Sequence, residues 1–238
     1  DGRIELPRTV KAIAPEAFKD CSRLKSINIG GSVTLIGDRA FYGCNTLTKA
    51  EFLPNTVTAI GEQAFAFCGK LGSANLPNSL VTIGNEAFRA CFALNAITIP
   101  ESTTNIGDNA FLDCSSLQQV TFLTNQLSIL PSGIFYQCKQ LKEALLPASV
   151  RRIKSSAFAY CESLSRVVLP EQLEAIGDDS FEYCKSLHAI DIPDSVVFVG
   201  ASAFHSCSSL TDVKLPYGLR HLLNDTFLDC TSLKAILI

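Results

Sequence analysis

The 238-residue chain contains 47% hydrophobic but only 18% charged residues, and its formal net charge is −3. This balance excludes a disordered chain, and it provides no basic field that would hold nucleic acid or an anionic membrane. No apolar run approaches the ~18 residues that a membrane-spanning helix requires, so we expect no direct membrane insertion.

One cysteine recurs every 23 or 24 residues along the whole chain, and each defines position 0 of a module. The ten are Cys21, Cys44, Cys68, Cys91, Cys114, Cys138, Cys161, Cys184, Cys207 and Cys230. Phe stands three residues before every cysteine and Leu three residues after it, without exception. Self-similarity at a fixed period indicates a repeat architecture in which each module stacks on the next.

Two short strands are predicted in each module. Apolar residues alternate at positions +6 and +8, as at Ile97 and Ile99, which is typical of a strand with one face buried. A proline such as Pro100 then ends this strand in many modules. A second apolar pair, such as Val33 and Ile36, lies at positions −11 and −8 of the following module and predicts a further short strand.

A short helix is predicted before each cysteine. Positions −8, −4, −3, 0 and +3 are apolar, as in the segment 83–94, and this is the spacing of one helix face. Position −6 carries Asp, Asn or Ser in seven modules, for example Asn85, and these residues often cap a helix N-terminus. Glycine precedes it in six modules, which suits a sharp turn into a helix of one or two turns.

These elements predict an α/β repeat solenoid over residues 1–238, with ten modules after a partial N-terminal one. A module of about 23 residues cannot bury its apolar face alone, whereas stacked copies can pair their strands as a parallel sheet. The chain begins at Asp1, lacks methionine and has no polar cap at either end. We therefore expect a fragment of a longer array, with its ends covered by further repeats, other domains or a partner.

Residues 77–99 read PNSLVTIGNEAFRACFALNAITI, and the same pattern continues through the chain. This pattern resembles the leucine-rich repeats of the BspA-like family, found on bacterial and protozoan surfaces. The resemblance implies a curved solenoid, with a parallel β-sheet on the concave side and short helices on the outer side. It also implies adhesion or partner binding at an extracellular or cell-surface location, and it brings no catalytic residues.

The cysteines are expected to be a column of buried free thiols. A spacing of 23 or 24 residues offers no paired ligands for zinc, although thiols about 5 Å apart on successive coils leave a disulfide open. His188, His205 and His221 occupy different module positions near no shared acid, so no catalytic triad is predicted. Tyr160 and Tyr183 share position −1, where packing is favoured over a ligand platform. No cofactor, metal or catalytic residue is predicted.

The candidate binding surface is formed by the outward strand positions, +5 and +7. Such positions are polar when they only face water, but Leu145 and Val168 are adjacent apolar exceptions. An exposed apolar spot with a polar rim indicates an interface, although two aliphatic residues also simply suit a strand. The candidate partner-binding residues are Thr98, Thr121, Glu143, Leu145, Arg166 and Val168.

The sequence bears on three classes of function. The favoured one is a non-catalytic module that presents its sheet to a protein or other macromolecule at the cell surface. A rigid scaffold docked within a larger intracellular assembly is the alternative. An enzyme is disfavoured, because no nucleophile, base or metal set stands apart from the repeat.

Overall fold

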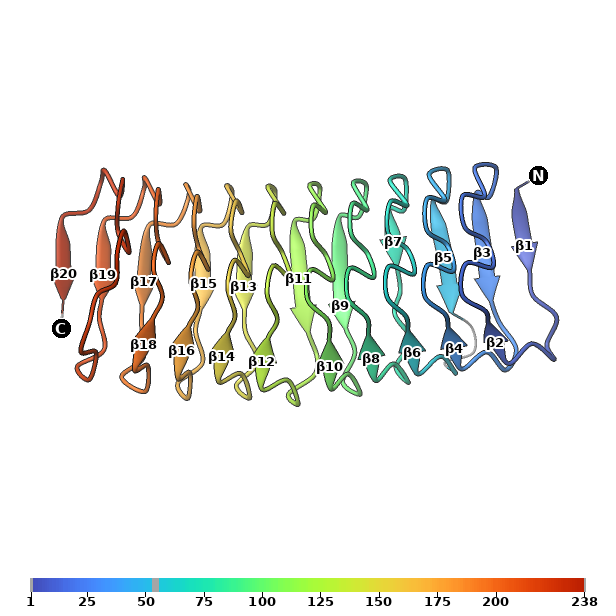
Figure 1. Cartoon of the computed structure of the whole chain (residues 1–238), viewed down its shortest axis with the longest axis horizontal. Coiled ribbons are helices and arrows are strands. Elements are labelled where there is room, and N and C mark those ends of the chain that lie inside the picture. Colours follow the sequence, from blue (N-terminus) through green and yellow to red (C-terminus); the bar gives the residue numbers. More distant parts are fainter. Residues whose placement is uncertain (1, 53–55, 238) are drawn as a thin grey trace.

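The computed structural model describes residues 2–52 and 56–237. Its coils stack one after another along a single axis, from the N-terminal to the C-terminal end (Figure 1). The described residues form twenty short strands in two columns that run the length of the stack, and every pairing among them is parallel. The predicted solenoid of stacked parallel coils is confirmed.

The first ladder contains the strands that follow each cysteine. They are β1 (Arg3–Glu5), β3 (Ser26–Ile29), β5 (Lys49–Phe52), β7 (Ser73–Ala74), β9 (Ala96–Ile99), β11 (Gln119–Phe122), β13 (Glu143–Leu145), β15 (Arg166–Val168), β17 (Ala189–Asp191), β19 (Asp212–Lys214) and β20 (Ala235–Leu237). Pairing keeps the repeat register, so that Ala96 lies beside Gln119 and Thr98 beside Thr121. Equivalent side chains of successive modules therefore form continuous columns on the same face.

The second ladder contains the two-residue strands that precede each turn segment. They are β2 (Ala12–Ile13), β4 (Leu35–Ile36), β6 (Ala59–Ile60), β8 (Thr82–Ile83), β10 (Asn105–Ile106), β12 (Ile129–Leu130), β14 (Arg152–Ile153), β16 (Ala175–Ile176) and β18 (Phe198–Val199). In each of them the second residue is buried and the first is not, as the apolar pattern at position −8 predicts.

The predicted short helices on the outer side are wrong, because the residues that the structure describes form no helix. Positions −5 and −1 of all ten modules have positive φ, for example Glu86 at 52° and Ala90 at 56°. A right-handed helix requires negative φ at every residue, so two left-handed residues within five positions exclude it. The segment is instead a series of tight turns, such as Arg89 N–H to the Glu86 carbonyl at 3.0 Å.

Backbone hydrogen bonds between modules replace those that a helix would make within itself. The N–H groups of Glu86, Phe88 and Ala90 donate to carbonyls of the next module at 2.8–2.9 Å. Each such bond contributes about 0.5–1.5 kcal/mol net, and it exists only when the next module is in place. The apolar positions of the predicted helix face are buried as a helix would bury them. Alternate backbone N–H groups of the segment, however, find hydrogen-bond acceptors in the neighbouring module.

The polar residues at position −6 join modules and do not cap helices. The Asn85 side-chain oxygen accepts the Asp108 N–H at 3.0 Å, and Asp38 accepts the Glu62 N–H at 2.8 Å. The glycine before position −6 has ordinary negative φ, so it is not there for a left-handed turn. A Cβ at Gly107 would clash with the backbone nitrogen and the side-chain oxygen of Asn85. Glycine is required because two backbones approach closely.

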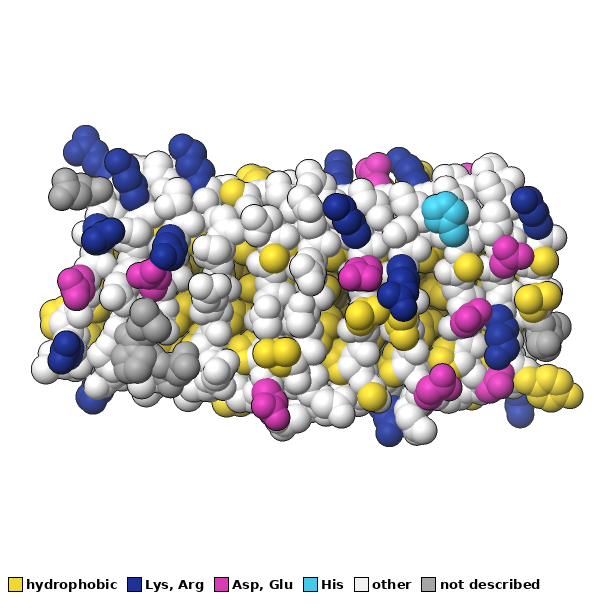
Figure 2. All heavy atoms as spheres, turned by 180° about the vertical axis from the view of Figure 1, so that it is seen from behind, with side chains coloured by type: hydrophobic (Ala, Val, Ile, Leu, Met, Phe, Trp, Pro, Cys, Tyr) yellow, Lys and Arg dark blue, Asp and Glu magenta, His cyan; other side chains and the backbone are white. Residues whose placement is uncertain are grey.

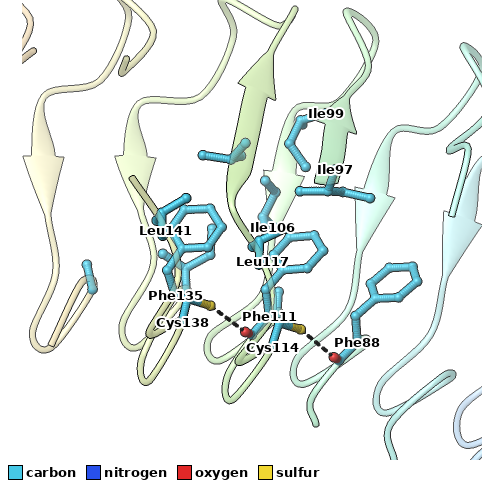
Figure 3. Close-up of a cluster of buried hydrophobic side chains, with 14 of the residues drawn as sticks. Phe88, Ile97, Ile99, Ile106, Phe111, Cys114, Leu117, Phe135, Cys138 and Leu141 are labelled. Carbon is cyan, nitrogen blue, oxygen red and sulfur yellow. Dashed lines mark hydrogen bonds between the residues drawn. The ribbon is translucent and has the colours of Figure 1, made fainter. Parts of the chain in front are cut away.

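The core consists of stacked columns of identical side chains. The ten Phe rings at position −3 form nine consecutive contacts, with centroids 5.0–5.8 Å apart. Figure 3 shows Phe88, Phe111 and Phe135 in this column, beside Leu117 and Leu141 of the position +3 column. Each stacked pair adds about 0.5–1.5 kcal/mol to the burial of its rings.

The ladders are interrupted at three places within the described residues: β7 to β9, β10 to β12, and β15 to β17. The second has a clear cause in the sixth module, the least regular one. Gly107 N–H donates to the Ile83 carbonyl at 2.8 Å, and other modules repeat this bond. Pro131 occupies the equivalent position and has no N–H, so the second ladder cannot continue there.

The close approach at Gly107 predicts that Gly107→Ala destabilises the protein by about 1–3 kcal/mol through overpacking. Gly218→Ala is the matched control, since a Cβ there meets nothing within 4 Å. It should leave the free energy of unfolding unchanged within ~0.5 kcal/mol. Urea denaturation followed by circular dichroism measures both. Equal changes in the free energy of unfolding would show that close backbone contact is not the reason for glycine at position 107.

The Phe column predicts a cost of about 3–5 kcal/mol for Phe111→Ala, through the cavity left in the middle of the stack. Phe92→Ala is the control, because the Phe92 side chain is 45% exposed and stands outside the column. The same urea denaturation compares the two variants. A Phe111→Ala protein as stable as Phe92→Ala would contradict the assignment of this column to the core.

Candidate functional site

The cysteine column is structural in its chemistry. All ten thiols are free and nine are buried, as predicted, whereas Cys21 is half-buried. The thiol of each cysteine after the first donates to the Phe carbonyl of the preceding module, at 3.0–3.3 Å. Figure 3 shows two of these bonds, from Cys114 to Phe88 and from Cys138 to Phe111.

Burial also suppresses the reactivity of these thiols. Loss of solvation raises the pKa of Cys44 to about 11 and that of Cys114 to about 12. The thiolate is the nucleophile and the metal ligand, so neither reactivity is available near neutral pH. Among residues 2–52 and 56–237, no three His, Cys, Asp or Glu side chains are grouped so that they could hold a metal ion.

The raised pKa values predict that a thiol reagent at pH 8 modifies only Cys21 quickly in the native protein. Cys44 and Cys114, with pKa values raised to about 11 and about 12, should react at least ~100-fold more slowly. The remaining buried thiols should also be slow, because loss of solvation raises their pKa values as well. In denaturant all ten should react. Ellman's reagent measures the count and the rate, and rapid modification of several native thiols would contradict the buried column.

His205 contacts two carboxylates that the sequence interpretation missed. Its Nδ1 lies 3.2 Å from Glu182 of the preceding module, and its Nε2 lies 3.6 Å from Asp229 of the following one. The sequence contained a signal for this contact. His205 and Glu182 both stand at position −2 and Asp229 at position −1, and such positions of successive modules become neighbours in a stack. The imidazole lies on the stacked edge of three coils and adds a polar contact between them.

The tyrosines of the same edge pack against one another. The rings of Tyr160 and Tyr183 are 4.7 Å apart at 10°, and the Tyr136 and Tyr160 rings are 5.4 Å apart. Ring faces that cover each other leave only their edges for a ligand. This geometry favours packing along the coil edge, as the sequence indicates, over a flat aromatic platform.

The six candidate partner-binding residues lie together on the first ladder. Thr98 (β9) pairs with Thr121 (β11), as described above. Glu143 and Leu145 of β13 lie directly beside Arg166 and Val168 of β15. Leu145 is 49% and Val168 is 43% exposed, whereas an ordinary inward strand residue such as Ala144 is fully buried.

Figure 2 views this face and shows hydrophobic side chains near charged ones, next to a broad stretch without charge. Arg166 and Glu143 form an ion pair at 3.7 Å, and both side chains are largely exposed, at 65% and 46%. An exposed pair of this kind contributes only about 0–1 kcal/mol to stability. The charged pair therefore borders the apolar pair of Leu145 and Val168 and is not a stabilising element of the fold.

A groove of about 450 Å³ opens beside Val168, where the first ladder is interrupted between β15 and β17. Its lining includes Val167, Ile190 and Asp191. The sequence interpretation missed this groove, because the module spacing from Cys161 to Cys184 is regular and nothing in it marks an interruption.

The model for the BspA type leucine-rich repeat region matches residues 2–118, 51–165 and 128–238. The chain belongs to the BspA-type leucine-rich repeat family. This confirms the resemblance seen in the sequence. Leucine-rich repeats of this family are generally non-catalytic modules, and the described residues include no helix long and apolar enough to cross a membrane.

Solved structures share the fold. A leucine-rich repeat protein from Bacteroides ovatus is 32% identical, with a TM-score of 0.87, over 98% of this chain. The chain spans 62% of the length of that protein. A leucine-rich cell surface protein from Faecalibacterium prausnitzii is 22% identical, covering 100% of this chain and 87% of that one, at a TM-score of 0.50. No curated protein matches the chain.

The pneumococcal vaccine antigen PcpA has the same fold at lower similarity. It is 22% identical, with a TM-score of 0.55, over 98% of this chain and 77% of that protein. The family model and these neighbours agree on a leucine-rich repeat fold for this chain.

Proposed function

We propose that the BspA-type repeat chain is an adhesion module that binds a macromolecular partner, a protein above all, through the outward face of its first ladder. The observation that carries this proposal is the pair of Leu145 and Val168, which are exposed side by side in register. At outward strand positions, large aliphatic side chains leave apolar surface in water that a partner could bury. An apolar centre with a polar rim is the usual composition of an interface.

The surroundings of this pair support the proposal. Thr98 and Thr121 extend the surface without charge, and Glu143 with Arg166 provides a charged border of both signs. We infer that these six residues contact the partner and that the ten modules act as one continuous surface. A cell-surface location is supported by the names of the structural neighbours, which include a cell surface protein and a vaccine antigen.

The test compares beads coated with the protein for adhesion to cultured epithelial cells and to purified extracellular-matrix proteins. Leu145→Asp combined with Val168→Lys should reduce adhesion at least ~10-fold, because it puts charge into the centre of the interface. Both side chains are exposed, so the free energy of unfolding should stay within about 1 kcal/mol of the parent.

The matched control changes exposed apolar residues of the second ladder, Leu35→Asp with Ile129→Lys, which are 44% and 41% exposed in the parent. This control should adhere like the parent protein. Equal adhesion of both double variants would place the interface elsewhere. Absence of adhesion by the parent protein to any of these surfaces would count against the adhesion function itself.

A further inference from the structure

The interruption between β15 and β17 exposes part of the core. Position +6 is buried in every module from the first to the ninth except the seventh, where Val167 is only half-buried. Val167 lines the groove of about 450 Å³, together with Leu169 and Ile190 of the core. This volume lies within the range of about 300–1,000 Å³ that is typical of ligand sites. The groove is therefore wide enough for a side chain, and its lining combines these apolar side chains with polar groups.

The groove lies where β15 and β17 stand side by side without a ladder. β15 pairs with β13 on its other side, and β17 pairs with β19, but no ladder pairing joins β15 to β17. Their facing edges therefore lack a ladder but leave no room for a further strand. The groove can admit a side chain of a partner from the outer face, and not a strand between β15 and β17.

The rim of the groove is acidic. Glu171, Asp191 and Asp194 line it, and Lys214 is the single basic residue that does so. Lys214 lies beside Asp191 in the strand register, whereas Glu171 and Asp194 occupy equivalent positions of successive modules. Neither of these two carboxylates forms an ion pair within the described residues. They favour a cationic ligand.

We infer that this groove binds an extended segment of a partner protein, in which an apolar side chain is flanked by lysine or arginine. The apolar side chain enters between β15 and β17 and contacts Val167, and the flanking cations lie against Glu171 and Asp194. Val168 also lines the groove, and Leu145 beside it continues the apolar contact outside. The inference rests on the proposed function, since it specifies the partner of the same face.

Three acetylated and amidated pentapeptides, SKLKS, SELES and SKSKS, test the inference by titration into the protein with ¹³C-labelled Ile, Leu and Val methyl groups. SKLKS should shift the methyl signals of Val167, Val168 and Ile190 in a saturable way. It should bind about five-fold more tightly than SELES, as two exposed charge contacts would give. SKSKS should not saturate, because it lacks the apolar side chain.

Charge reversal provides the second arm. Glu171→Lys with Asp194→Lys should invert the preference, so that SELES binds more tightly than SKLKS. Glu101→Lys is the matched control, since Glu101 is exposed at the equivalent position of the fourth module, outside the groove, and it should leave the preference unchanged. Circular dichroism verifies that both variants are folded.

The inference is wrong if SKLKS shifts methyl signals only outside the groove, if SKSKS binds as tightly, or if reversal leaves the preference unchanged. Adhesion that depends on Leu145 and Val168, with no peptide response in the groove, would contradict this inference alone. A peptide response in the groove of a protein that adheres to nothing would contradict the proposed adhesion function alone.

Discussion

The stack depends on positive φ angles at positions −5 and −1 before each cysteine. Two left-handed residues per module turn alternate N–H groups toward the next coil, where carbonyls accept them. A coil in isolation would leave these groups without protein partners, so the folded state exists only as an array. The Phe carbonyl takes part as well: Phe88 accepts the Cys91 N–H at 3.3 Å and the Cys114 thiol at 3.2 Å.

This arrangement gives a physical reason for cysteine at position 0. The position is fully buried in the middle of the stack, so an apolar residue of small volume is favoured. The thiol adds a weak donor that reaches the carbonyl of the preceding module, and it costs little when buried. Serine would offer a stronger donor, but its hydroxyl loses more free energy on burial than a thiol does. Cysteine meets both requirements.

Most of the fold could be predicted from the sequence, because the period fixes which side chains point inward. The short helices could not be, since apolar residues spaced three and four apart fit a helix face and also a coil of tight turns. The composition of position −5 held a clue. Asn109, Asp179, Asp225 and Gly133 stand there, and these residue types tolerate left-handed φ better than others do.

Only part of the candidate site, too, could be predicted from the sequence. Leu145 and Val168 could be identified because they violate the expected polarity of outward positions, and the structure leaves them exposed and adjacent. The groove beside them could not be identified, because it depends on whether β15 and β17 pair, and the module spacing is regular there. The interruption at Pro131 has a local chemical cause, a missing N–H, whereas the one at Val167 has none in the sequence.

Inward and outward positions of this solenoid are subject to separate physical constraints. The Phe, Leu and Cys columns are invariant along the chain because each side chain must match its copy in the next module. Outward strand residues meet only water and their neighbours on the ladder, so most substitutions there change stability by less than ~0.5 kcal/mol. Glu143 and Arg166 illustrate this freedom, since their exposed ion pair contributes little to the fold. A surface that the fold does not need can be adapted to a partner without loss of stability, and that separation suits a repeat array to binding.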